Sequence, residues 1–253
     1  MALIEKAKGR RADQSPSSYT RLFGVPALGN LISRIQAAVI SSGSELEQLI
    51  WDRVVQIDDL DHFLNTTLHS EEDKLFVARK QKIKTCKSIR SKFEPDFLAF
   101  HPLTRNCHIV EVKDGDQFDT KKAAGERQML GDFRDDVSHS VPYITHVYLC
   151  SFNSLTREEI YRGLKRKFQM EELLTGMELC NLFRIEYDSI VKHRQKDQQA
   201  NLKYIAQELL AIDGIRDIVL KSIEASGGAL LRPADPLMSD SLAAQPQLIP
   251  TTA

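Results

Sequence analysis

Two short stretches, EPDFLAF (residues 94–100) and CHIVEVK (residues 107–113), place charged side chains inside apolar runs that are typical of strands. Side chains alternate between the two faces of a strand, so Glu111 and Lys113 emerge side by side on one face. If the two strands pair as a hairpin, Asp96 can lie across from Glu111. Two carboxylates and an ammonium group would then meet at one sheet surface.

Two carboxylates that converge in this way predict a bound cation. They repel each other, and their burial is costly unless a cation lies between them. Carboxylate oxygens, together with oxygens of water and phosphate, suit Mg²⁺. The ammonium group of Lys113 could orient a metal-bound water or help to deprotonate it.

The order Pro95-Asp96, then 14 residues, then Glu111-Val112-Lys113 resembles the signature of the PD-(D/E)xK nucleases. The resemblance implies that Asp96 and Glu111 are metal ligands, together with the carbonyl of Val112. It also implies that Lys113 is the catalytic lysine and that the reaction is metal-assisted hydrolysis of a phosphodiester. The alternative is a surface hairpin with an ordinary Glu–Lys pair and a solvated aspartate.

The resemblance extends over residues 43–152 and implies further candidates. Glu47 lies on a predicted helix before the signature, where many nucleases of this family have a glutamate that assists the metal site. Glu45, nearer the opposite flank of the helix, is the alternative. Gln128 lies on the predicted helix after the signature, where exonuclease-like members have a glutamine followed four residues later by tyrosine. Here that fourth residue is Asp132, which departs from the exonuclease pattern. A solvated helix face is the other interpretation of these residues.

A basic tract, KLFVARKQKIKTCKSIRSK (residues 74–92), runs directly into the strand of Asp96. It holds eight lysines and arginines and no acidic residue. Such a tract would attract a polyanion, and contacts with phosphates would make the affinity sensitive to salt. An ordinary solvated face is the alternative. We predict DNA contacts for Lys80, Lys82, Lys84, Lys87, Arg90 and Lys92, and for Lys121 and Lys122 on the following helix.

The order of the strands and helices predicted around these residues indicates an α/β fold with a mixed central sheet flanked by helices, like the core of restriction endonucleases. The C-terminal part is predicted to be mostly helical. A third strand is predicted at residues 144–152. Helices are predicted at residues 42–57, 120–136, 156–168, 170–182 and 197–225, the last divided at Asp213-Gly214. The predicted domains are a flexible basic arm (residues 1–22), a single nuclease domain (23–226) and a flexible tail (227–253).

The composition argues against several other classes of protein. The chain has 253 residues, with 34 Lys and Arg against 35 Asp and Glu, so its net charge is near zero. No apolar run approaches the ~20 residues of a membrane helix, and the N-terminus lacks the apolar core of a secretory signal. The four cysteines form no C-x-x-C pair, which argues against a zinc ribbon and for a reducing setting. The sequence has no phosphate-binding loop, so no nucleotide cofactor is expected.

Together with the resemblance, these features indicate a type II restriction endonuclease. Such an enzyme would use Mg²⁺, for which Mn²⁺ could substitute. It would act as a homodimer on a short site in double-stranded DNA, in the cytoplasm of a prokaryote. The alternatives are a repair nuclease, a junction resolvase or a nickase of the same superfamily, a catalytically inactive DNA-binding protein, and a protein-interaction domain with a chance motif.

Overall fold

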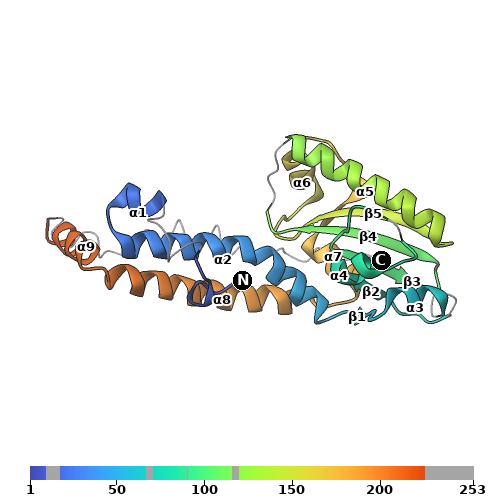
Figure 1. Ribbon diagram of the computed structural model, residues 1–253, viewed down its shortest axis with the longest axis horizontal. Coiled ribbons are helices and arrows are strands. Elements are labelled where there is room, and N and C mark those ends of the chain that lie inside the picture. The colour runs from blue at the N-terminus through green and yellow to red at the C-terminus, as the bar shows by residue number, and fades with distance from the viewer. Residues whose placement is uncertain (10–17, 67–70, 90, 116–119, 226–253) are drawn as a thin grey trace, which may run out of the picture. The chain divides into compact units, whose positions relative to one another are not determined.

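The computed structural model describes residues 1–9, 18–66, 71–89, 91–115 and 120–225 (Figure 1). The chain forms two compact units, Met1–Tyr204 and Ile205–Ala253. The first unit holds the sheet and all of the candidate residues. In the second unit the structure describes α9 (Asp213–Ala225). No helix within the described ranges is both long enough and apolar enough to span a membrane.

A mixed sheet of six strands forms the centre of the first unit. The strands lie side by side in the order β1 (Val55–Gln56), β2 (Phe76–Arg79), β3 (Phe97–His101), β4 (Asn106–Lys113), β5 (Ile144–Ser151) and β6 (Leu173–Thr175). β3 pairs antiparallel with both β2 and β4, whereas the other neighbouring strands pair in parallel. Parallel neighbours need a crossover connection, and α5 (Thr120–Ser140) lies in the crossover between β4 and β5.

Helices cover both faces of this sheet and bury two apolar clusters against it. The first cluster joins one face to α3 (Leu60–Asn65), α4 (Lys80–Thr85), α5 and α6 (Arg157–Gly163). The second cluster joins the other face to α2 (Pro26–Trp51), α7 (Gly176–Phe183) and the start of α8 (Tyr187–Leu210). Along β4, Ile109 belongs to the first cluster and Val110 to the second. Glu111 therefore shares the face of Ile109, which α5 covers.

The helices α2 and α8 lie side by side and run antiparallel (Figure 1). At one end Arg53 donates a hydrogen bond to Ser189 at 3.0 Å. At the other end the guanidinium of Arg34 lies 5.0 Å from the ring centroid of Tyr204. The first residues of the chain pack on this helix pair, because Ile4 in η1 (Ile4–Lys6) is buried and its N–H donates to Asn201 of α8 at 2.8 Å. The short α1 (Ser18–Phe23) precedes α2.

The predicted α/β class is confirmed, and the three predicted strands are present as β3, β4 and β5. The helix predicted at residues 42–57 begins earlier, at Pro26, and ends at Trp51, because Val55 and Gln56 pair with β2. The last predicted helix is present in two pieces, α8 and α9, but it begins earlier than predicted, at Tyr187. Within the basic tract, β2 is a strand that the sequence patterns did not predict.

The single helix predicted at residues 170–182 is wrong. This segment begins with η3 (Met170–Glu172), continues as β6 and only then forms α7. Thr175 explains the division, since its hydroxyl accepts a hydrogen bond from the N–H of Glu178 at 3.2 Å in a capping box. The helix must therefore start after Thr175, and the residues before it are free to pair with β5.

The predicted domain boundaries stay predictions. Of the predicted basic arm (residues 1–22), residues 10–17 lie outside the described ranges. The predicted tail (residues 227–253) also lies outside them.

Candidate active site

The pairing of β3 with β4 brings Asp96 opposite Glu111. Phe97 is the partner of Val110 in this antiparallel ladder, so the next position on each strand sets Asp96 against Glu111. Both residues are buried, with exposed fractions of 6% and 7%. The backbone N–H of Val112 donates a hydrogen bond to Oδ2 of Asp96 at 2.8 Å, which fixes the orientation of this carboxylate.

Lys113 contacts two carboxylates that come from different elements. Its Nζ lies 2.6 Å from Oε1 of Glu111, on the same strand, and 2.9 Å from Oε1 of Glu126, on α5. Glu126 is also buried, with an exposed fraction of 6%. Burial by itself would lower the pKa of Lys113, but the ion pairs with Glu111 and Glu126 outweigh this effect and raise it. The side chain therefore remains an ammonium ion.

The two facing carboxylates bind protons more tightly than exposed carboxylates do. Burial, and then the charge of Glu47, raise the pKa of Asp96 to about 6, although the hydrogen bond from Val112 opposes this shift. Burial, and then the charge of Asp96, raise the pKa of Glu111. In both groups burial is the larger cause of the raised pKa, and the neighbouring negative charge adds to it.

The donor atoms at this site fit a divalent metal ion. Two buried oxygens in the described cluster, Oε2 of Glu111 and Oε2 of Glu126, have no hydrogen-bond partner. A buried carboxylate oxygen without a donor is unfavourable, and a cation near Glu111 would relieve this cost. All of the candidate ligands are hard oxygen atoms, which suit Mg²⁺ or Mn²⁺ better than Zn²⁺.

Glu47 lies on α2 and acts electrostatically on the same cluster. Its side chain is half-buried, and burial raises its pKa. Burial is the largest influence on the pKa of Glu47, and the next are the charges of Lys80, Glu111 and Lys113. The structure thus brings the predicted helix glutamate within electrostatic range of the two strands.

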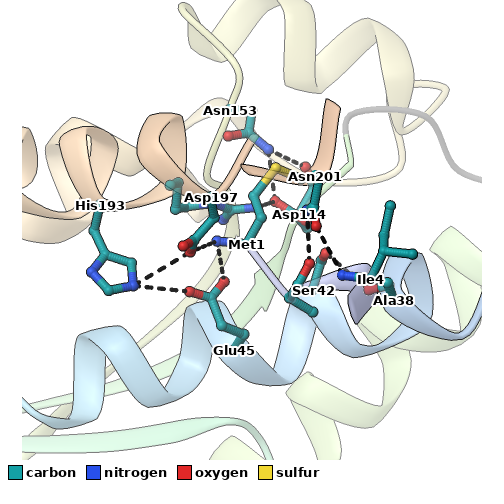
Figure 2. Close-up of polar contacts among 12 residues, drawn as sticks. Met1, Ile4, Ala38, Ser42, Glu45, Asp114, Asn153, His193, Asp197 and Asn201 are labelled. Carbon is teal, nitrogen blue, oxygen red and sulfur yellow. Dashed lines mark hydrogen bonds and ion pairs between the residues drawn. The ribbon is translucent and has the colours of Figure 1, made fainter. Parts of the chain in front are cut away.

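Glu45 belongs to a separate group with His193 and Asp197 (Figure 2). Each of these residues offers a possible metal ligand, and the three atoms lie within 4.8 Å of one another. However, the N-terminal ammonium of Met1 lies 2.7 Å from Oδ2 of Asp197 and 3.0 Å from Oε2 of Glu45. A cation from the chain itself therefore already balances these two carboxylates.

The helix α5 contributes Glu126 to the cluster, and the structure does not bring Gln128 there. The side chain of Gln128 is exposed and donates a hydrogen bond to Asp132 at 2.7 Å. The sequence carries a signal for Glu126 that the nuclease signature does not include. The signal is its spacing: Glu126 is an acidic residue on the same helix face as the buried residues Ala123 and Leu130.

Asp114, which follows Lys113 directly, makes structural contacts at the end of β4. Its Oδ1 accepts a hydrogen bond from Arg194 of α8 at 2.6 Å. It also accepts one from Asn153 at 2.7 Å (Figure 2). The bond from Arg194 ties the end of β4 to α8, and the bond from Asn153 ties it to the residues after β5. Asp116, the next acidic residue, lies outside the described residues.

The basic tract forms β2, α4 and the loop that leads to β3. The backbone N–H of Lys80 donates to the carbonyl of Asp96 at 3.0 Å, so the start of α4 adjoins the carboxylate cluster. Arg90 lies outside the described residues, as does the side chain of Lys121. The remaining predicted DNA contacts are exposed, except for the half-buried Lys82; they are Lys80, Lys84, Lys87, Lys92 and Lys122.

Asp61 of α3 fixes the loop after α4. Its carboxylate accepts hydrogen bonds from the N–H groups of Lys87 and Ser88, each at 2.9 Å, and from the hydroxyl of Ser88 at 2.7 Å. The bonds from Ser88 and Lys87 lower the pKa of Asp61 below its usual range. The loop backbone is therefore held in place while the side chain of Lys87 stays exposed.

A comparison with known proteins identifies the family. No protein-family model matches the chain. The chain is 37% identical over 227 residues to the type II restriction enzyme HhaII of Haemophilus parahaemolyticus, and the match covers 87% of this chain and 99% of HhaII. This chain belongs to the HhaII family of type II restriction enzymes. Because the match covers nearly the whole of HhaII, the family assignment applies to the enzyme as a whole and not to one shared segment.

For this member of the HhaII family, the raised pKa of Asp96 predicts that the metal-free protein loses stability as the pH rises. An unfolded aspartate releases its proton near pH 3.8, whereas Asp96 in the folded protein does so near pH 6. Between these values the folded state binds more protons, so the free energy of unfolding falls with increasing pH. We expect the titration of Asp96 to lower the free energy of unfolding by about 1–3 kcal/mol between about pH 4 and about pH 7.5.

Thermal unfolding in EDTA across this range, compared with the Asp96→Asn variant, measures the effect. The difference in melting temperature between variant and wild type should grow in favour of the variant as the pH rises. A difference that does not change with pH would contradict the raised pKa.

Proposed function

We propose that this chain is a Mg²⁺-dependent restriction endonuclease that hydrolyses phosphodiester bonds at a short specific site in double-stranded DNA. The observation that carries the proposal is the buried pair of Asp96 and Glu111, with Lys113 held beside it by ion pairs. Membership of the HhaII family supports the cleavage of DNA at specific sites. The hard oxygen ligands support Mg²⁺, with Mn²⁺ as a substitute.

In this proposal Asp96, Glu111 and the carbonyl of Val112 would hold the metal ion. When bound, Mg²⁺ would polarise a phosphoryl oxygen and lower the pKa of a water molecule. Glu47 would add negative charge at the edge of the same site. Gln128 is left out of the proposed site, because its side chain is exposed and bonded to Asp132.

Lys113 would act on the water that attacks phosphorus. Its ammonium lies on the face of β4 that carries Glu111, so it can hold the attacking water by a hydrogen bond and balance negative charge that develops on the phosphoryl oxygens. The oxygen of water would form a new bond to phosphorus while one ester P–O bond breaks, and the proton that the water loses would pass to solvent. The departing oxygen would take up a proton from solvent.

The basic tract would bind the DNA backbone beside this site. Exposed lysines on α4 and in its loop adjoin the strand of Asp96, and they would guide the scissile phosphate toward the carboxylates. We propose a homodimer in the cytoplasm of a prokaryote, because a two-fold symmetric pair of active sites can cut both strands of a palindromic site.

Digestion of supercoiled and linear plasmid DNA with Mg²⁺ tests the proposed function. We expect a limited set of discrete fragments with linear DNA, and no cleavage when EDTA replaces Mg²⁺. Nicked circles without linear product would indicate a nickase, and a strong preference for branched DNA would indicate a resolvase or a repair enzyme. DNA binding without cleavage in either Mg²⁺ or Mn²⁺ would contradict the proposal.

Replacing two exposed lysines of the basic tract should weaken DNA binding without affecting the choice of site. Each lysine that contacts a phosphate contributes about 0.9 to the slope of log K against log salt concentration. We therefore expect Lys84→Ala combined with Lys87→Ala to reduce this slope by up to about 2. The measurement is fluorescence anisotropy with duplex DNA at several salt concentrations in EDTA.

The matched control for this experiment is Lys203→Ala, which removes an exposed lysine of α8 outside the basic tract. It should leave the slope as in the wild type. If the double variant also keeps the wild-type slope, the basic tract does not contact the DNA backbone.

A further inference from the structure

We infer that Glu126 is a positioning residue, which holds the ammonium of Lys113 from α5 and leaves Glu111 free to act as a metal ligand. This inference rests on the proposed function. Glu126 lies outside the nuclease signature and reaches the site from the helix that packs over the face of Glu111.

The contacts of Lys113 show why two carboxylates are needed. Its Nζ lies 2.6 Å from Oε1 of Glu111 and 2.9 Å from Oε1 of Glu126. An ammonium group with Glu111 as its only partner would compete with a metal ion for that carboxylate. With Glu126 on its other side, Lys113 is held between the two groups, and the second oxygen of Glu111 has no hydrogen-bond partner among the described residues. That oxygen is the one that a metal ion could take.

Stability alone does not account for Glu126. The surrounding face of α5 is apolar, with Ala123, Leu130 and Phe133 fully buried. A buried ion pair in such a setting is often no more stable than well-packed apolar side chains. One oxygen of Glu126 is also buried with no hydrogen-bond partner in the described part of the chain, which adds a further cost. A role for the pair at the neighbouring carboxylates explains an arrangement that packing does not favour.

The consequence is a specific kinetic effect. Glutamine at position 126 keeps the size of the side chain but removes its charge, so Lys113 would move toward Glu111. We expect kcat to fall by about 10–100-fold, because small displacements of a catalytic group have effects of this size. The Mg²⁺ concentration needed for half-maximal activity should rise, since the ammonium then competes more strongly for Glu111. KM for DNA should stay within about twofold, because the side chain of Glu126 is buried and does not contact DNA in this proposal.

The experiment compares Glu126→Gln and Glu126→Asp with the wild-type enzyme, and uses Asp132→Asn as a matched control on the exposed side of α5. Steady-state cleavage gives kcat and KM at several Mg²⁺ concentrations, and DNA affinity is measured in EDTA. Glu126→Asp, which keeps the charge, should recover part of kcat and of the Mg²⁺ response. The control should behave as the wild type.

Two results would overturn the inference. One is a Glu126→Gln enzyme with wild-type kcat and Mg²⁺ response. The other is a loss of kcat that Glu126→Asp does not relieve while both proteins remain folded, because charge at this position would then not matter. If Glu126→Gln does not fold, Glu126→Asp decides: the inference predicts a reduced kcat with unchanged KM, and a wild-type kcat contradicts it. The Lys113→Ala enzyme separates the two proposals. If it is fully active, the function assigned to Lys113 is refuted. If it is inactive while Glu126→Gln behaves as the wild type, only the inference about Glu126 is refuted.

Discussion

Replacing Lys113 by alanine should lower kcat for DNA cleavage by about 10²–10⁴-fold, the usual range for a residue that assists proton transfer or charge balance at the reacting atoms. Lys113 is the ammonium group that contacts Glu111 directly, and its ion pairs keep it charged. DNA affinity in EDTA should stay close to that of the wild type, because the ammonium of Lys113 is paired with Glu111 and Glu126. Gel assays of cleavage under single-turnover conditions measure the effect.

The control for this variant is again Lys203→Ala, which should cut DNA at the wild-type rate. Removal of Lys113 also leaves Glu111 and Glu126 without their shared counter-ion, so the metal-free variant should unfold at a lower temperature than the wild type. Mg²⁺-dependent cleavage at an undiminished rate would show that Lys113 has no catalytic role.

Replacing Asp96 by asparagine should abolish the metal response and at the same time stabilise the metal-free protein. We expect cleavage to fall by about 10²–10³-fold, because the phosphate and the leaving oxygen lose a positioned metal ion. At neutral pH the variant no longer has to bury an ionised Asp96 near Glu111 and Glu47, which repel it. The free energy of unfolding in EDTA should therefore rise by about 1–3 kcal/mol.

A second substitution at the same position distinguishes charge from hydrogen bonding. Asparagine can still accept the hydrogen bond from the N–H of Val112, whereas alanine leaves this buried donor without a partner. Asp96→Ala should therefore be less stable than Asp96→Asn, although both are inactive. Thermal unfolding with and without Mg²⁺ provides the measurement. Mg²⁺ should raise the melting temperature of the wild type more than that of Asp96→Asn. Equal increases in the two proteins would contradict the assignment of Asp96 as a metal ligand.

The central part of the site could be predicted from the sequence because it depends on short-range geometry. Alternation along CHIVEVK puts Glu111 and Lys113 on one face, and pairing of the two strands then sets Asp96 opposite Glu111. These relations need only a strand period and a hairpin, which a local pattern can show. The fold class was predictable for the same reason, since most strands and helices have clear periods.

Residues that come from distant elements were harder to predict. Glu126 meets Lys113 only when α5 has packed over the sheet, and its position in an apolar helix stripe is a weak signal on its own. Gln128 was selected from a family pattern, but its place on the helix turns it toward solvent. The strand β6 is three residues long and is set by a capping box and by pairing with β5, so no period could reveal it.

The most direct test of the metal site is anomalous diffraction from crystals of the enzyme soaked in Mn²⁺. The proposed function predicts an anomalous peak between the carboxylates of Asp96 and Glu111, and no such peak in crystals of Asp96→Asn. A peak only at the group of Glu45, His193 and Asp197, with none between Asp96 and Glu111, would contradict the account.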